Sequence, residues 1–130
     1  MGRILVVDDD PDFLEIMRTI LLADDHEVFT ASSGDEAVSR MHSTVPDLVL
    51  LDMMMSHVLE GSDVMRQMWQ DSALRSIPVI VVSSLTATRE AEMFSPEDHV
   101  SMVDWVSKPV RPDALRERVR RLLSQGQSGP

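Results

Sequence analysis

Five short apolar runs, rich in valine, isoleucine and leucine, recur along this chain and are separated by amphipathic helical patterns. Runs of this kind are typical of strands that are buried on both faces of a sheet. Alternation of strands and helices predicts an α/β protein with a doubly wound parallel sheet and helices on both faces. The expected strands are residues 4–7, 28–31, 48–51, 79–82 and 102–106.

Helix boundaries are marked by capping residues. Asp10 followed by Pro11 is typical of an N-cap with proline at the first helical position, and this helix is expected to run to about Ala23. Ser33 and Glu36 have the spacing of a capping box, which predicts a second helix as far as about His42. Further helices are expected around residues 64–69 and from residue 112 to about residue 123.

The chain length of 130 residues indicates one domain, which we expect to span residues 1–124. Residues 125–130 form a polar tail or the start of a linker. The net charge of −10 argues against direct nucleic-acid binding, because phosphate neutralisation needs clustered lysine and arginine. There is no cysteine and no long uncharged apolar run, so we expect a soluble cytoplasmic protein without membrane contact.

Polar residues follow four of the expected strands. Asp8, Asp9 and Asp10 come after the first, and the remaining positions are Asp52, Ser83 and Lys108. Ligands of such sheets bind at the carboxyl ends of the strands. Several carboxylates there must share protons or hold a cation, and an all-oxygen donor set favours Mg²⁺. A hydroxyl and an ammonium beside that cation could take the oxygens of a phosphoryl group, which leaves one carboxylate as a nucleophile.

Four motifs together identify a family. They are Val6-Val7-Asp8-Asp9-Asp10-Pro11, the run from Pro46 to Met55 around Asp52, the run from Ile77 to Ser83, and Trp105-Val106-Ser107-Lys108-Pro109. The chain from Arg3 to about Leu123 resembles the receiver domains of bacterial response regulators. The resemblance implies a flavodoxin-like receiver fold, a five-stranded parallel sheet in the order 2-1-3-4-5.

The resemblance also implies the site chemistry. Asp52 is the expected phosphoacceptor, and Asp8, Asp9, Asp52 and the backbone carbonyl of Met54 are the expected Mg²⁺ ligands. The domain is then a signalling phosphoacceptor and not an enzyme, apart from self-phosphorylation from small donors. Met54 and Leu85 occupy positions that tune phosphoryl lifetime in relatives, and neither side chain can activate water, so we expect slow self-dephosphorylation.

Three further roles carry over from the resemblance. Lys108 is expected to pair with the acceptor or its phosphoryl group, Ser83 is the switch hydroxyl, and Trp105 holds the aromatic switch position. The implied partners are a histidine kinase or a histidine phosphotransfer protein, and an unknown downstream protein. A phosphorylation-dependent homodimer is a further alternative.

Departures from the family pattern keep alternatives open. Ser56 stands where the family usually has proline, Gly61 comes one residue late, and Pro96 is expected to end or interrupt a fourth helix. The main alternative is a pseudo-receiver, the same fold used as a phosphorylation-independent binding module. A more remote one is a phosphohydrolase of the haloacid dehalogenase type, suggested by the spacing of Asp8 and Asp10.

The remaining charged residues have simpler interpretations. The four histidines show no metal-ligand spacing, so we expect solvated surface positions for all of them: His26, His42, His57 and His99. The arginines of the last helix are expected to form its solvated face, with partner binding as the alternative: Arg116, Arg118, Arg120 and Arg121.

Overall fold

The computed structural model describes residues 2–52, 60–83, 103–107 and 110–127. The strands are β1 (Arg3–Val7), β2 (Glu27–Ala31), β3 (Leu48–Asp52), β4 (Val79–Ser83) and β5 (Val103–Ser107). All neighbouring pairs are parallel and the order is β2-β1-β3-β4-β5, which confirms the predicted sheet. The helices are α1 (Pro11–Leu22), α2 (Gly34–Thr44), α3 (Glu60–Gln70) and α5 (Pro112–Gln127). Residues 84–102, where a fourth helix was expected, lie outside the described residues.

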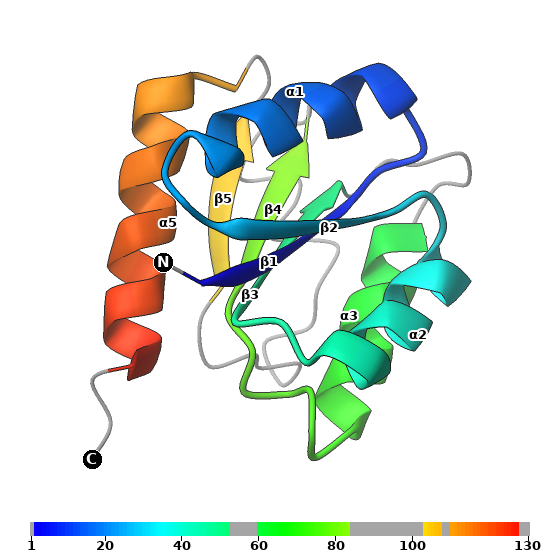
Figure 1. The fold of residues 1–130 in the computed structure, drawn as a ribbon. Coiled ribbons are helices and arrows are strands. Elements are labelled where there is room, and N and C mark those ends of the chain that lie inside the picture. Colours follow the sequence, from blue (N-terminus) through cyan, green and yellow to red (C-terminus); the bar gives the residue numbers. More distant parts are fainter. Residues whose placement is uncertain (1, 53–59, 84–102, 108–109, 128–130) are drawn as a thin grey trace.

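Helices cover both faces of the sheet, with α1 and α5 on one side and α2 and α3 on the other (Figure 1). Alternate strand residues face opposite layers, so one strand supplies two cores. Leu5 and Leu51 belong to the core beneath α2 and α3, whereas Ile4 and Leu50 belong to the core beneath α1 and α5. All four are at most 1% exposed. Burying one such side chain contributes roughly 1.5–3 kcal/mol, which explains why the strands are nearly continuous apolar runs.

The predicted caps are confirmed. Asp10 has extended backbone angles and its Oδ1 accepts a hydrogen bond from the Asp12 amide at 3.0 Å, with Pro11 opening α1. The Ser33 hydroxyl accepts from the Glu36 amide at 3.2 Å at the start of α2. The Glu36 carboxylate reaches back to the Ser32 amide at 2.6 Å. Asp10 and Ser33 satisfy backbone donors that have no partner inside the first helical turn, whereas Glu36 satisfies the amide that precedes the N-cap.

The last helix differs from the prediction. Helix α5 continues to Gln127, so residues 125–127 of the predicted polar tail have helical backbone. Extending an existing helix adds one hydrogen bond for each residue that is fixed, and it needs no apolar side chain. The division into a domain at 1–124 and a tail or linker therefore stays a prediction. Among the described residues, none of the helices has both the length and the apolar composition needed to cross a membrane.

Candidate functional site

The strand register brings the predicted site positions to one edge of the sheet. Val7 of β1 pairs with Leu51 of β3, so Asp8 follows directly beside Asp52. Asp52 itself pairs with Val82 of β4, and the next residue of that strand is Ser83. The carboxyl ends of β1, β3 and β4 therefore carry Asp8, Asp52 and Ser83 on adjoining strands.

The fifth strand completes this carboxyl edge. Ser83 pairs with Ser107, the last residue of β5, and Lys108 follows it in the chain. Trp105 pairs with Val81, which is two residues before the edge. Lys108 and Met54 lie outside the described residues, as do the longer loop expected after Asp52 and the Pro96 region. Their roles stay predictions, as do those of the side chains of Asp52, Ser83 and Trp105.

Asp8 is a carboxylate held inside the molecule. Only 1% of its surface is exposed, because it directly continues the buried strand β1. Its amide donates to the carbonyl of Ala31 at 3.1 Å, and its Oδ1 accepts from the amide of Asp10 at 3.0 Å. These hydrogen bonds fix the backbone and one carboxylate oxygen of Asp8 at the ends of β1 and β2. Such fixed geometry suits a metal ligand.

The three consecutive aspartates have different surroundings. Asp8 is buried, Asp9 is exposed, and Asp10 is exposed and caps α1. The capping role uses one oxygen of Asp10, whereas Asp9 lies next to the carboxyl edge without any capping contact among the described interactions. The sequence motif therefore divides into a helix cap, Asp10, and an acidic pair beside Asp52.

The donor set at this edge fits Mg²⁺. Its members are carboxylates from the ends of β1 and β3, and the described residues at these strand ends include no sulfur or imidazole ligand. Mg²⁺ is usually bound through one or two carboxylates and retains several waters. Among the side chains that the structure describes, no group of three histidines or acids could hold a metal. Asp8 and Asp9 are the described residues that would hold the ion, together with Asp52.

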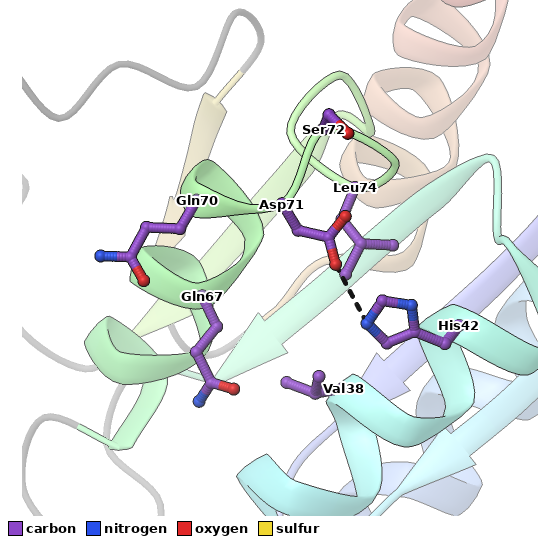
Figure 2. A pocket seen from close by; sticks show the side chains of 7 residues that line it. All are labelled: Val38, His42, Gln67, Gln70, Asp71, Ser72 and Leu74. Atoms are coloured by element: carbon purple, nitrogen blue, oxygen red, sulfur yellow. Dashed lines mark ion pairs between the residues drawn. The ribbon is translucent and has the colours of Figure 1, made fainter.

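The other end of the sheet contains a groove between α2 and α3. It has a volume of about 460 Å³, and Figure 2 shows His42 and Asp71 facing each other across it. The Nε2 of His42 lies 3.1 Å from Oδ2 of Asp71. The His42 side chain is 52% exposed, which confirms its predicted surface position. This groove is lined by the carboxyl-terminal turns of two helices, so it is separate from the carboxyl edge.

The prediction for His26 is wrong. His26 was expected on the solvated surface, but it is only 4% exposed and its Nδ1 accepts a hydrogen bond from the Gly2 amide at 3.1 Å. The contact joins residues 24 positions apart, so no local pattern could have indicated it. His57 and His99 lie outside the described residues.

The arginines of α5 are mostly in ion pairs. Arg121 pairs with Glu117 within the helix and is exposed, as expected for a solvated helix face. Arg116 pairs with Asp113, but Arg116 and Arg118 are half-buried, so the prediction of a solvated face is wrong for these two. Arg120 instead reaches Asp24, which follows α1, at 3.1 Å. This tertiary ion pair was not predicted, since its partners are 96 residues apart.

Comparisons with known proteins agree on one family. The sequence profile of the response regulator receiver domain matches residues 4–120. The "DNA-binding response regulator MtrA" of Mycolicibacterium smegmatis is 33% identical over 128 residues, which cover 98% of this chain and 53% of that protein. The "Probable transcriptional regulator ycf27" of Porphyra purpurea is 36% identical over 121 residues, which cover 93% of this chain and 47% of that protein. The chain thus spans about half the length of these relatives.

Solved structures show the same architecture. The signal receiver domain of a signal transduction histidine kinase from Syntrophus aciditrophicus superposes with a TM-score of 0.85 at 31% identity. That match covers 100% of this chain and 96% of the other. A CheY-like receiver domain protein from Methanospirillum hungatei has a TM-score of 0.83 at 24% identity, with 98% and 97% of the two chains covered. The second likeness concerns the fold alone.

Proposed function

Because the chain belongs to the response regulator receiver domain family of two-component systems, we propose that it accepts a phosphoryl group on Asp52. The observation that carries this proposal is the register at the carboxyl edge. Asp8 and Asp52 lie on adjoining strand ends, and Ser83 ends the next strand. The proposed nucleophile, the residues that would hold the metal ion and the residues that would bind phosphoryl oxygens can therefore all lie around one phosphoryl group.

The proposed reaction moves a phosphoryl group from a phosphohistidine to a carboxylate. An oxygen of Asp52 attacks phosphorus, the bond from phosphorus to the donor's imidazole nitrogen breaks, and an acyl phosphate forms. The donor is a histidine kinase or a histidine phosphotransfer protein. Lys108 and Ser83 then bind phosphoryl oxygens through their ammonium and hydroxyl groups.

The acidic pair prepares this edge for a doubly charged group. Mg²⁺, when bound, would neutralise carboxylate charge and stabilise the negative charge on the phosphoryl oxygens. Asp8 is suited to hold the ion because its backbone contacts fix one oxygen and burial restricts its side chain. Without a cation, the charges of Asp8, Asp9 and Asp52 would repel an incoming phosphoryl group.

Phosphorylation would then change the conformation through Ser83 and Trp105. New hydrogen bonds to a charged group contribute roughly 1.5–3 kcal/mol each, so two or three of them supply the about 5.5 kcal/mol that reverses a 1:99 equilibrium. Met54 and Leu85 cannot activate water, so the phosphorylated state would be long-lived. Membership of a signalling family argues against the phosphohydrolase alternative.

The output is proposed to be a protein contact. With a net charge of −10, this domain is poorly suited to bind nucleic acid directly. One relative is named a DNA-binding regulator and another receiver belongs to a histidine kinase, so receivers of this type accompany different outputs. An unknown downstream protein or a second phosphorylated copy of the chain would read the switch.

The decisive experiment is intact-mass spectrometry after incubation with acetyl phosphate, with and without Mg²⁺. The wild type should gain one phosphoryl group only with Mg²⁺, and Asp52→Asn should gain none. Asp47→Asn, the same change directly before β3 instead of at its last residue, should behave as the wild type does. If neither acetyl phosphate nor a phosphorylated kinase modifies the wild type, the pseudo-receiver alternative replaces this proposal.

A further inference from the structure

We propose that His26 is an acid-sensitive latch, whose protonation releases the start of β1 from the connection between α1 and β2. The latch lies at the amino end of the sheet and does not depend on the proposed phosphorylation. It would make the receiver fold less stable in acid through a contact that is unrelated to Asp52.

The hydrogen bond fixes the protonation state of the imidazole. Nδ1 of His26 accepts from the Gly2 amide at 3.1 Å, so this nitrogen carries no proton and the neutral ring is protonated at Nε2. Nε2 is buried and has no hydrogen-bond partner among the described residues. A second proton would have to go onto Nδ1, where it would face the N–H of Gly2. Protonation therefore converts a donor–acceptor contact into a donor–donor contact.

Gly2 is held closely on the other side. Its carbonyl accepts from the Glu27 amide at 2.9 Å, which extends the pairing of β1 with β2. A Cβ added at Gly2 would lie 3.1 Å from both methyl groups of Leu123 and 3.3 Å from Oδ2 of Asp47. The latch therefore joins β1, β2 and α5, and Gly2 has little room to move without breaking its bond to His26.

Charged groups surround the latch on several elements. Asp24 and Asp25 precede His26, and Asp24 is bound by Arg120 of α5 through two contacts of 3.1 and 3.2 Å. Glu27 follows in β2 and is exposed, with its carboxylate 3.7 Å from Arg3 of β1. Asp47, before β3, accepts from the Arg3 amide at 2.8 Å.

The neighbouring acids are thus largely engaged elsewhere. Asp24 is bound by Arg120, and both Glu27 and Asp47 contact Arg3. Asp25 is exposed and has a left-handed backbone with φ of 63°. Burial and the positive charge of the amino terminus lower the pKa of His26 below its ordinary 6.5, and Arg120 adds to this, whereas Asp24 and Asp25 oppose it. The neutral, latched state is therefore favoured near neutral pH.

The sign of the pH effect follows from that direction. The unfolded chain binds the His26 proton more tightly than the folded chain does. The contribution of the latch to folding stability is therefore fully present above pH 6.5. Stability is lost as the pH falls below 6.5 and through the folded pKa of His26. Below that pKa the loss levels off.

The test is the melting temperature between pH 8 and pH 5 for wild type, His26→Asn and His42→Asn. Asparagine can present an oxygen near the position of Nδ1 but does not titrate. The melting temperature of the wild type should fall by about 3–5 °C more than that of His26→Asn over this range. A shift of this size corresponds to about 1 kcal/mol in a domain of this length. His42→Asn removes an exposed imidazole and should not reduce the acid loss. Equal acid losses in wild type and His26→Asn would overturn the proposal.

A second measurement does not depend on how the variants fold. The imidazole ¹⁵N spectrum of the wild type should show Nε2 protonated and Nδ1 bare at pH 7.5. Acid titration of the same ring should occur below pH 6.5, with the amide protection of Gly2 and Glu27 lost over the same range. A ring protonated on Nδ1, or amide protection that is unchanged through the titration, would show that the latch does not exist.

Discussion

The carboxyl and amino ends of the parallel sheet differ in how their charged side chains are arranged. At the carboxyl end, Asp8 and Asp52 lie at neighbouring positions at the ends of the paired strands β1 and β3, and the exposed Asp9 comes directly after Asp8. These groups have the same charge, and one of them is almost fully buried. Like charges placed this close repel one another, so such an arrangement favours binding of a cation or sharing of protons.

At the amino end, groups of complementary character are paired. Gly2 donates to His26, Arg3 donates to Asp47, and His42 faces Asp71. Each pair joins segments that are distant in the sequence, so it contributes to holding the fold together. The comparison supports the proposal that the carboxyl end binds a charged ligand, whereas the contacts at the amino end stabilise the fold. Substitutions at the two ends should therefore change different properties.

The largest expected effect is at the carboxyl end. Asp8→Asn keeps an oxygen for the Asp10 amide but removes the charge of a proposed metal ligand. Loss of a residue that only supports a ligand costs up to about 100-fold, so the rate of phosphorylation with Mg²⁺ should fall by at least about 100-fold. The melting temperature without Mg²⁺ should rise, because like-charge repulsion decreases. Intact-mass time courses and thermal melts measure both. Asp24→Asn, at the amino end, should phosphorylate within about twofold of the wild type; equal losses in both variants would remove the distinction between the ends.

Whether a structural feature could be predicted from the sequence depends on how far apart in the chain the residues that form it are. The strands, caps and carboxyl edge were predicted because runs such as Ile4–Val7 and pairs such as Asp10 with Pro11 act locally. The ends of parallel strands then coincide by geometry. The burial of His26 was not predictable, because it depends on a contact with Gly2 across the fold.

Two further features lacked a sequence signal. The ion pair of Asp24 with Arg120 requires α5 to lie beside the end of α1, which no helical pattern specifies. Val45 has a left-handed backbone with φ of 44°, although β-branched residues disfavour that conformation. In both places the tertiary structure overrides the local preference of the residue.

The next largest effect is at Gly2. Gly2→Ala would place a methyl group 3.1 Å from Leu123 and 3.3 Å from Asp47, so unfolding should become easier by about 1–2 kcal/mol in urea titrations. Phosphorylation should not change. Leu123→Val shortens the side chain that must yield, so the double variant should be destabilised by less than the sum of the two single changes. Strict additivity would mean that the close contact does not cause the loss.

A smaller effect, of opposite sign, is expected at Val45. This residue ends α2 with its amide donating to the Met41 carbonyl at 2.9 Å, and it is 53% exposed, so its side chain contributes little packing. Val45→Gly should raise the free energy of unfolding by about 1 kcal/mol, because glycine adopts the left-handed region without steric cost. Ser43→Gly, two residues earlier within α2, should lower it by about 0.5–1 kcal/mol. A loss in both variants would show that Val45 is not strained.

The smallest effect is expected for the ion pair between Asp24 and Arg120, because the Arg120 side chain is 64% exposed and solvent screens such a pair. The hydrogen bond from Arg120 lowers the pKa of Asp24 below its ordinary 3.8, so its contribution is complete above that value and is lost as the pH falls through the folded pKa. Arg120→Gln should therefore lower the melting temperature slightly at pH 7 in low salt. The difference from wild type should shrink in 1 M NaCl, where screening is strong, and towards pH 3. Arg121→Gln, which removes a pair within α5, is the matched control and should change the melting temperature less. Of these two pairs, the one made by Arg120 joins α5 to the end of α1, whereas the one made by Arg121 lies within a single helix.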